Sequence, residues 1–367
     1  MPLHKNLSVH FVVPYPINTA PGQRFRFEQY LKFLDAEGFT IRFSSFVDLS
    51  SYKILYQGEN PVRKLRTIVV GFFKRFLLLP VLLKADYVFL FREAAPVGPP
   101  IFEWIIAKIL SKKIIYDFDD AIWLTDKTSE SMFEKALRWR TKVRLICKWS
   151  YKISCGNEYL CNFAHQYNKN VILIPTTIDT EKVHNPALYN AVHRFTDDEK
   201  IIIGWTGSHS TLKYLGAIES VLQNLEMKYQ QLEFWVIADK SPQLELKCLR
   251  FKPWSLKSEI ADLAEFDIGI MPLPDDEWAN GKCGFKVLQY MALQIPAIAS
   301  PVGVNRQIIQ SGINGYLCDS LKSWEGHLME LIENKALRNS IGIEARNTVI
   351  ERYSVLATKN NFIGLLK

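Results

Sequence analysis

The sequence predicts an α/β protein of two doubly wound, Rossmann-like domains that face a central cleft. Short apolar runs alternate with amphipathic segments along its 367 residues, as in parallel sheets covered by helices. The alternation starts afresh near residue 200, after a polar stretch at 185–199. Each half begins with a strand, a glycine-containing loop and a helix. We therefore expect an N-terminal domain over 1–185 and a C-terminal domain over 186–352.

The composition narrows the function classes. Hydrophobic residues make up 48% of the chain and charged residues 23%, as in globular proteins with a sizeable core. The net charge of +7 suits an acidic partner, such as a phosphorylated substrate or an anionic membrane surface. No basic tail, recognition helix or zinc-finger pattern is present in the sequence, so nucleic acid is not expected as a partner. The six cysteines form no CxxC pair, which fits a reducing compartment.

The first half predicts six strands. Their apolar runs lie at 7–13, 39–46, 86–92, 112–119, 151–157 and 171–176. Helices are expected at 24–38, which ends at a glycine, and near 98–111. The N-terminus lacks the apolar region and cleavage site of a signal peptide, so its apolar run is interpreted as the first strand.

The second half repeats the pattern. Apolar runs at 200–208, 232–239, 266–273 and 295–301 predict strands. A long amphipathic helix is expected at 211–229, and a second helix follows Gly284. Ligands of such folds bind beyond the carboxyl ends of the strands, so the loops that follow the strands are where we look for chemistry.

Residues 62–85 are both apolar and basic. Lys74 and Arg75 interrupt the segment, so it falls short of the roughly 20 apolar residues that a spanning helix needs. Two interpretations stay open: a helix that lies on an anionic membrane surface, or a buried helix with a solvated basic edge. In either case its basic residues, Arg63, Lys64, Arg66, Lys74 and Arg75, are expected along the edges of the apolar face.

Two loops offer anion sites at helix starts. In the first, residues 14–31, Gly22 permits a turn, and Arg24 and Arg26 lie where helix N–H groups are exposed. The alternative is a plain joint with solvated arginines. The second, residues 204–215, is a candidate phosphate cradle or an ordinary capped helix start. It contains Gly207, hydroxyl residues at Ser208, Ser210 and Thr211, His209, and Lys213 in the first helical turn.

The third loop places two lysines at the start of a helix. Gly281, Gly284 and the helix N-terminus predict a positive corner, and Lys282 and Lys286 are expected on nearly the same face. A bound diphosphate would relieve the repulsion between the two ammonium groups. The alternative is that nearby acids pair with them: Asp275, Asp276 and Glu277.

Carboxylates and an arginine follow two strands of the first half. Asp117, Asp119 and Asp120 end the strand at 112–119, and Arg92 and Glu93 end the strand at 86–92. The aspartates suit contact with a bound polar ligand, a general base, a structural pairing with a cation, or a divalent metal. Arg92 and Glu93 are interpreted as ligand contacts or as a buried ion pair.

Residues 266–317 resemble the donor-binding segment of the retaining GT-B glycosyltransferases of family 4, group 1 type. The shared features are Met291-Ala292, Pro296, Gly303 and the loop at 312–315. "GWTGSHSTLKYL" resembles the family's phosphate loop, with Lys213 in the position of a diphosphate-binding lysine. "YPINTAPGQRFRFEQYL" resembles its N-terminal glycine loop, and "IPTTIDTEKVHNP" resembles the segment that closes its first domain.

The chain departs from the family at three positions. Gly281 and Gln289 stand where the family has two glutamates that contact the sugar and the ribose. Gln289 can still hydrogen-bond a ribose hydroxyl. Asp276 or Glu277 would have to supply the sugar contact. Asp119 stands where the family often has a histidine that faces the sugar.

The resemblance and the loops together give the expected site residues. The catalytic candidates are Asp119, Lys213 and Lys286. The donor-binding candidates are Gly22, Gly207, Ser208, Lys213, Lys282, Gly284, Phe285, Lys286 and Gln289. The candidates for acceptor or sugar contact are Arg24, Arg92, Glu93, Asp117, Asp120, Asp276 and Glu277.

The resemblance implies a hexosyltransferase-like glycosyltransferase that needs neither metal nor cofactor, because the nucleotide sugar is its substrate. The C-terminal domain would bind the donor, the N-terminal domain a saccharide or lipid-linked saccharide acceptor, and a last helix near 353–367 would pack back on the first domain. The expected setting is bacterial cell-surface polysaccharide synthesis in the cytoplasm, peripheral to the inner face of the membrane. Two alternatives are a nucleotide-sugar epimerase on the same fold and a non-catalytic nucleotide-sugar-binding scaffold subunit.

Overall fold

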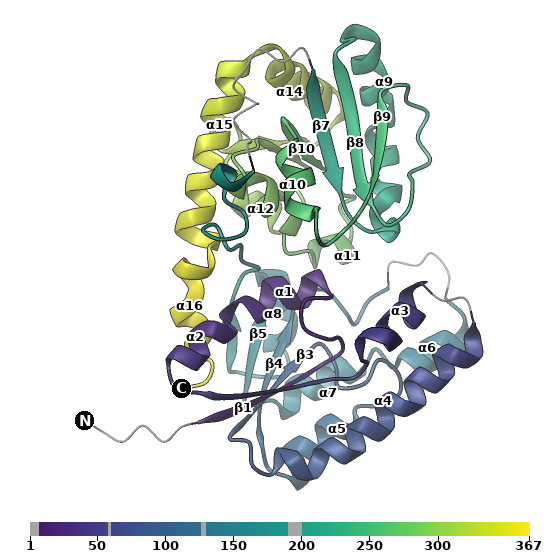
Figure 1. The fold of residues 1–367 in the computed structure, drawn as a ribbon, viewed down its shortest axis with the longest axis vertical. Helices are drawn as coiled ribbons and strands as arrows, with labels where there is room; N and C mark the ends of the chain where they lie inside the picture. Colours follow the sequence, from purple (N-terminus) through teal and green to yellow (C-terminus); the bar gives the residue numbers. More distant parts are fainter. Residues whose placement is uncertain (1–6, 58–59, 126–129, 190–199) are drawn as a thin grey trace. The chain divides into compact units, whose positions relative to one another are not determined.

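The computed structural model describes residues 7–57, 60–125, 130–189 and 200–367. The chain divides into two compact units, each with its own sheet (Figure 1). Unit 1 contains Met1–Thr176 and Thr358–Lys367, and unit 2 contains Thr177–Ala357. Each unit has a six-stranded sheet covered by helices, and the paired strands are parallel. The predicted α/β class with two doubly wound, Rossmann-like domains is confirmed.

The sheet of unit 1 has the strand order β2-β1-β3-β4-β5-β6. Its strands are β1 (Ser8–Val13), β2 (Thr40–Ser45), β3 (Tyr87–Phe91), β4 (Lys113–Phe118), β5 (Lys152–Cys155) and β6 (Val171–Leu173). The chain runs outward from β1 to β2 and then returns to the other side of β1 with β3. The carboxyl ends of β1 and β3 therefore form a topological switch point, which is where such sheets bind ligands.

The helix predicted over 24–38 is divided into three pieces. These are α1 (Pro21–Arg26), the 3-10 turn η1 (Glu28–Tyr30) and α2 (Leu31–Ala36). Phe27, at the first break, has φ −132° and ψ −28°, outside the helical range. Its buried ring packs against the rings of Phe11 and Phe89, with centroids 5.3 and 5.4 Å apart. The break accompanies the insertion of this ring into the core.

Unit 1 has further helices besides α1 and α2. They are α3 (Leu49–Gln57), α4 (Pro61–Leu82), α5 (Ile101–Trp104) with its π-helical continuation η2 (Ile105–Ile109), α6 (Met132–Arg138), α7 (Lys142–Trp149) and α8 (Glu158–His165). The last helix, α16 (Val355–Gly364), begins in unit 2 and ends in unit 1. In unit 1 its Phe362 stacks on Tyr30 with ring centroids 4.3 Å apart.

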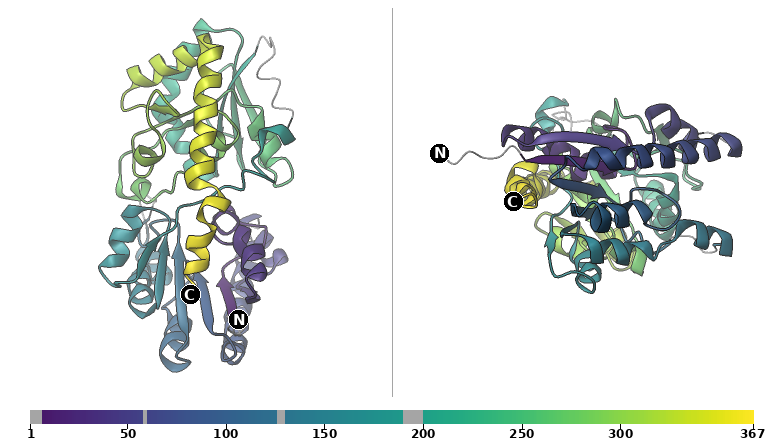
Figure 2. Two further views of the ribbon diagram at one scale, coloured as in Figure 1. Left: turned by 90° about the vertical axis from the view of Figure 1, so that its left-hand side faces the viewer. Right: turned by 90° about the horizontal axis from the view of Figure 1, so that it is seen from below.

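Helix α4 contains most of the apolar and basic segment at 62–85 and lies on the outside of unit 1 (Figure 2). Its inward face is made of Thr67, Gly71, Arg75 and Leu82. Arg75 donates to the carbonyl oxygens of Val13 at 2.6 Å, Ala94 at 2.7 Å and Ser44 at 3.1 Å. The sequence predicted Arg75 on a basic edge of the helix, and this prediction is wrong. The guanidinium points inward because it satisfies three backbone carbonyls. Within the described ranges no helix is long and apolar enough to span a bilayer.

The sheet of unit 2 has the order β12-β11-β10-β7-β8-β9, with its switch point between β7 and β10. Its strands are β7 (Ile201–Thr206), β8 (Leu232–Ala238), β9 (Leu249–Pro253), β10 (Ile268–Met271), β11 (Ala297–Ala299) and β12 (Gly315–Leu317). Its helical segments are η3 (Pro186–Leu188), η5 (His209–Ile218), α9 (Glu219–Lys228), α10 (Glu259–Ala264), α11 (Glu277–Asn280), α12 (Phe285–Ala292), α13 (Asn305–Ile308), α14 (Leu321–Glu333), α15 (Lys335–Thr348) and η6 (Val349–Tyr353). The helix expected over 211–229 is instead a 3-10 segment, η5, followed by α9.

The close approach at Gly71 gives a test of how α4 is seated. A Cβ atom at Gly71 would lie 2.3 Å from the Phe46 ring, so Gly71→Ala should overpack this contact and destabilise unit 1 by about 1–3 kcal/mol. Gly326→Ala is the control, because a Cβ there meets nothing within 4 Å and α14 should gain stability. Thermal and urea unfolding of both variants would measure the difference. Equal stability of the two variants would contradict this account of the packing.

Candidate functional site

Four predicted residues of unit 1 meet at the carboxyl ends of β3 and β4. Arg92 Nε donates to Asp119 Oδ1 at 2.7 Å, and Arg92 Nη2 donates to Asp120 Oδ2 at 2.8 Å. A Cβ atom on Gly22 would lie 3.0 Å from Asp119 Oδ2 and 3.4 Å from Arg92 Nη2. The glycine thus lets α1 approach the pair of carboxylates. All three charged side chains remain partly exposed.

The backbone holds Arg92 in an uncommon conformation. Its φ is +56°, in the left-handed region that non-glycine residues rarely adopt. Its N–H donates to the Asp117 carbonyl and its own carbonyl accepts from the Tyr116 hydroxyl, both at 2.8 Å. Backbone strain of this kind clusters at functional sites, where surrounding contacts maintain it.

The electrostatics of this cluster favour a charged Arg92 and disfavour charge on Asp119. Burial opposes the charged guanidinium, but Asp119 and Asp120 outweigh it and raise the pKa of Arg92. Burial raises the pKa of Asp119, with a further contribution from Asp120, while Arg92 acts in the opposite direction. Arg92 thus contacts both carboxylates, and partly exposed carboxylate oxygens can bind a hydroxyl or accept a proton.

Asp117 does not belong to this exposed cluster. Its carboxylate is buried and receives Arg26 Nη2 at 2.6 Å and Arg26 Nε at 3.2 Å. Arg26 also donates to Ser154 Oγ at 3.2 Å and to the Ile174 carbonyl. This corrects two expectations: Asp117 is in a structural ion pair instead of an acceptor site, and Arg26 is turned into the core instead of toward an anion.

Glu93 and Arg24 were also expected to contact the acceptor or the sugar, and the structure places them differently. Glu93 pairs with Lys142 at 2.6 Å, so the Arg92–Glu93 pair considered from sequence does not form. Arg24 lies in the last turn of α1, not at its start, and its guanidinium lies 5.0 Å from the centre of the Phe25 ring.

Gln23, which shapes the first loop, was not predicted from the sequence. Buried Gln23 accepts from the Tyr15 N–H at 2.9 Å and donates to the Tyr15 carbonyl at 3.0 Å. It also donates to Glu28 Oε1 at 3.1 Å, and Glu28 Oε2 accepts from the Asn18 N–H. Burial raises the pKa of Glu28. A glutamine two residues into a helix carries no sequence signal for this role.

In unit 2 the second loop follows β7 at the switch point. The Gly207 N–H donates to the Ile237 carbonyl at 3.1 Å, and a Cβ on Gly207 would lie 2.5 Å from the Trp205 ring. Ser208 is the N-cap of η5 without using its side chain as a cap, and its hydroxyl lies 2.9 Å from that of Ser210. Lys213 is exposed on η5, with its ammonium 5.4 Å from the centre of the Tyr214 ring.

His209 in this loop has a partner that the sequence did not predict. Its N–H donates to Asp239 Oδ1 at 2.6 Å, and its ring Nδ1 lies 2.6 Å from Asp239 Oδ2. Asp239 directly follows β8, so the contact ties the carboxyl ends of two adjacent strands together. The aspartate fixes the position of the loop between Gly207 and Lys213.

The third loop reaches the same switch point from β10. Gly284 is the N-cap of α12 in the left-handed conformation, with φ +67°, and Phe285 is the first residue of the helix. Lys286 extends its ammonium over the Trp205 ring, 5.2 Å from the centre. Because Gly207 also packs on Trp205, this ring joins the second loop to the N-terminus of α12.

Lys282 lies outside that helix. It sits between α11 and Gly284, so the two lysines do not share a helical face as predicted, and its ammonium lies 4.6 Å from the centre of the Trp278 ring. Asp276 is the N-cap of α11 and accepts from the Ala279 N–H at 2.7 Å. Asp275 lies 3.9 Å from Arg306, and Glu277 begins α11 on the surface. Asp276 is therefore tied to its own helix by one oxygen.

Gln289 is turned away from solvent. It is 1% exposed, and its amide nitrogen lies 3.4 Å from His184 Nε2 and 3.5 Å from Glu259 Oε1. This corrects the expectation that Gln289 reaches a ribose hydroxyl. The helix turn that carries it faces the interior of unit 2, and the amide is used to satisfy two other buried side chains.

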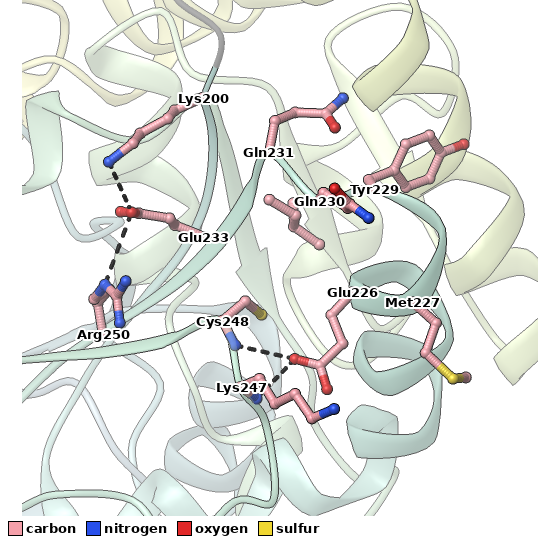
Figure 3. Close-up of a pocket in the computed structure, with 11 residues that line it drawn as sticks. Lys200, Glu226, Met227, Tyr229, Gln230, Gln231, Glu233, Lys247, Cys248 and Arg250 are labelled. Atoms are coloured by element: carbon pink, nitrogen blue, oxygen red, sulfur yellow. Dashed lines mark hydrogen bonds and ion pairs between the residues drawn. The ribbon is translucent and has the colours of Figure 1, made fainter.

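We also searched the rest of unit 2 for a metal site or a ligand pocket. Among the described residues no group of three or more histidine, cysteine, aspartate or glutamate side chains is arranged to hold a metal ion. A pocket of about 370 Å³ lies near the amino ends of β7, β8 and β9 (Figure 3). Its Glu233 accepts from Lys200 at 3.1 Å, and its Glu226 accepts from two backbone N–H groups. The pocket is at the edge of the sheet opposite to the carboxyl ends, so we do not place the site there.

Asp117, in β4, and Asp120, two residues after its end, should respond differently to mutation. Asp117→Ala should destabilise unit 1 by about 3–5 kcal/mol, because it leaves the Arg26 guanidinium buried without its carboxylate. Asp120→Ala removes a partly exposed partner of Arg92 and should cost about 1 kcal/mol or less. Thermal unfolding followed by circular dichroism would compare them. A smaller loss for Asp117→Ala than for Asp120→Ala would contradict the assignment.

Known proteins share this architecture. Residues 200–334 match the family model described as "Glycosyl transferases group 1". A comparison with the curated proteins gives no match. Similar solved structures include a glycosyltransferase from Rickettsia africae ESF-5, with 16% identity and a TM-score of 0.68 over 99% of this chain and 100% of that one.

Two further structures cover both units. Sucrose-phosphate synthase from Thermosynechococcus elongatus has 13% identity and a TM-score of 0.69, over 98% of each chain. Anabaena Alr3699/HepE in complex with UDP-glucose has 12% identity and a TM-score of 0.67, over 98% of this chain and 99% of that one. At these identities the likeness is one of fold. The chain therefore has the GT-B fold, and its residues 200–334 match the group 1 glycosyl transferase family model.

Proposed function

We propose that the chain transfers a sugar from a nucleoside-diphosphate donor, bound by unit 2, to a saccharide acceptor bound by unit 1. One observation carries the proposal: the 207–213 loop and the first turn of α12 meet around Trp205, inside the segment that matches the group 1 domain. Lysines and the N–H groups of a helix start at one switch point suit a diphosphate.

The residues of unit 2 would act on the leaving group. During transfer the bond between the anomeric carbon and the diphosphate oxygen breaks, and negative charge develops on the diphosphate. Lys213 and Lys286, with the N–H groups at the start of α12, would stabilise that charge, and Lys282 would add to the positive field. Because these groups supply the neutralising charge, the proposed reaction needs no divalent ion.

Unit 1 would act on the other side of the reaction. The acceptor hydroxyl must lose its proton as its oxygen bonds to the sugar, and we assign Asp119 to contact that hydroxyl or the sugar. Arg92 positions Asp119 through the 2.7 Å hydrogen bond, and Asp120 shares the same cation. The raised pKa of Asp119 makes it a better proton acceptor than an ordinary aspartate.

We also propose a class of donor and a cellular setting for the reaction. The Anabaena protein of the same fold was solved with UDP and with UDP-glucose, so uridine diphosphate sugars are the first donors to test. We propose a saccharide or lipid-linked saccharide as acceptor, in cell-surface polysaccharide synthesis at the inner face of the cell membrane. The exposed apolar side chains of α4 support a membrane location for the acceptor.

A second candidate is a non-catalytic nucleotide-sugar-binding subunit. It is favoured by Gly281 and by the burial of Gln289, since the resembled family places its sugar and ribose contacts at these positions. Donor binding without turnover on any saccharide acceptor would favour this candidate. Donor epimerisation without an acceptor would instead indicate an epimerase.

The diphosphate assignment predicts which lysines matter. Lys213→Ala should weaken nucleoside-diphosphate binding by about 1.5–3 kcal/mol, the range for hydrogen bonds to charged groups. Lys286→Ala should also weaken it, whereas Lys257→Ala, an exposed lysine elsewhere in unit 2, should not. Isothermal titration calorimetry with UDP and GDP measures this. Wild-type affinity in both loop variants would rule out the phosphate-binding role of these loops.

Removing divalent ions tests which groups neutralise the diphosphate leaving group. Because lysines and helix N–H groups neutralise the leaving group in this proposal, transfer should continue in excess EDTA. The measurement is sugar transfer with and without chelator, followed by addition of Mg²⁺ or Mn²⁺. Activity that disappears with EDTA and returns with the metal would show that the leaving group depends on a cation.

If Asp119 is the base, the rate of sugar transfer should depend on pH. A base must be ionised, and burial raises the pKa of Asp119, so kcat/KM should fall as the pH drops through a value above the ordinary aspartate range. Asp119→Asn should lower kcat by about 10²- to 10⁴-fold and remove this acidic limb. A pH–rate profile from pH 4 to 8 is the measurement. An unchanged limb in Asp119→Asn would assign it to another group.

A further inference from the structure

Helix α4 exposes more large apolar side chains than packing on unit 1 requires. Large apolar side chains cover its outer face, and five of them are between 59% and 72% exposed: Val62, Leu65, Val69, Phe73 and Leu77. Its inner face includes Thr67, Gly71 and Arg75. A surface helix normally buries its large apolar residues and exposes its polar ones. The outer face is therefore not explained by the packing of unit 1.

The apolar face continues onto α5. Phe76 of α4 packs edge-on against the buried ring of Phe102, with centroids 4.9 Å apart. On α5 itself, Ile101 and Trp104 are exposed. We define the α4–α5 face by Val62, Leu65, Val69, Phe73, Phe76, Leu77, Ile101 and Trp104. Contiguous exposed apolar faces of this kind mark interaction sites.

The charged side chains that α4 itself carries are all basic. α4 has five basic residues and no acidic one, and of these Arg63, Arg66 and Lys74 are exposed. The acids of the chain between α4 and α5 are held elsewhere: Asp86 by Ser8, and Glu93 by Lys142. Glu103, on α5, is buried. Asp48, which pairs with Lys74 at 3.1 Å, is an exposed acid at this edge. The outer side of α4 thus combines exposed apolar side chains with exposed basic ones.

We infer that the α4–α5 face docks unit 1 on an anionic lipid surface. Apolar and aromatic side chains would enter the interface, while Arg63 and Arg66 would lie at the level of the headgroups. A second copy of the chain fits less well, because pairing the face with itself would bring basic residues against basic residues. The inference stands on unit 1 alone and does not depend on sugar transfer.

Vesicle binding tests the inference directly. The intact protein should co-sediment with vesicles of phosphatidylcholine and phosphatidylglycerol at low salt, and much less with phosphatidylcholine alone. Added salt should release it. Arg63→Glu with Arg66→Glu should lower the partition coefficient by at least ten-fold, since each basic residue near an anionic surface contributes about a five-fold effect. Phe73→Ser with Leu77→Ser should lower it on the same vesicles.

Matched variants in unit 2 control for net charge and for exposed apolar area. Lys257→Glu with Lys322→Glu changes the net charge equally, and Met227→Ser with Ile343→Ser removes two apolar side chains that are exposed there. Both pairs should bind vesicles as the wild type does. Melting temperature verifies the fold of each variant, and nucleotide titration reports on unit 2 separately from vesicle binding.

Three results would overturn the inference. The first is wild-type protein that stays in the supernatant with anionic vesicles at low salt. The second is vesicle binding that neither pair of α4 variants reduces. The third is a dimer in sedimentation velocity that Phe73→Ser with Leu77→Ser dissociates, without lipid binding, since this would assign the face to a second copy.

Discussion

The buried ion pair between Arg26 and Asp117 is the contact on which the site of unit 1 depends. Arg26 comes from α1 and reaches the ends of β4, β5 and β6 through Asp117, Ser154 and Ile174. The pair fixes the first loop and the end of β4 against each other, and the Asp117 carbonyl in turn receives the Arg92 N–H. The exposed cluster of Arg92, Asp119 and Asp120 is thus built on a charge that water does not reach. Burying such a pair costs desolvation, which good geometry and further hydrogen bonds to the guanidinium offset.

Unit 2 uses an aromatic ring where unit 1 uses an ion pair. Trp205 ends β7 in the interior, and its ring supports Gly207 on one loop and Lys286 on the other. An ammonium group over an aromatic face is attracted to it without losing its hydrogen-bonding capacity. This arrangement keeps a positive charge at the switch point while leaving it able to bind an anion. The contact between His209 and Asp239 then restricts the loop from the neighbouring strand.

Local patterns predicted the strands well, because apolar runs between turn residues specify them without knowledge of the rest of the chain. β9 and β12 were missed, since a run such as "LRFKP" mixes basic and apolar residues and "GYL" is too short to show a period. In the site, strand ends located Arg92, Asp119 and Asp120. Local sequence patterns could not predict the ion pair between Arg26 and Asp117, because the two residues are 91 positions apart. Gln289 and Arg75 were misplaced for the same reason, because only the tertiary fold decides which polar side chain satisfies buried groups.

Helix α4 has a buried face that folding requires and an exposed face whose residues can be changed. Arg75 remains inside, with its pKa lowered to about 10 by burial, and binds three carbonyls at the ends of β1, β2 and β3. Gly71 lies on Phe46, so neither position tolerates a different shape. Val62, Leu65, Val69, Phe73 and Leu77 are instead 59–72% exposed, so most of their surface lies outside the core. Protein engineers can therefore replace the outer face with glutamate, lysine and glutamine, and keep the helix in place, to obtain a version that stays dispersed at the concentrations needed for crystallisation.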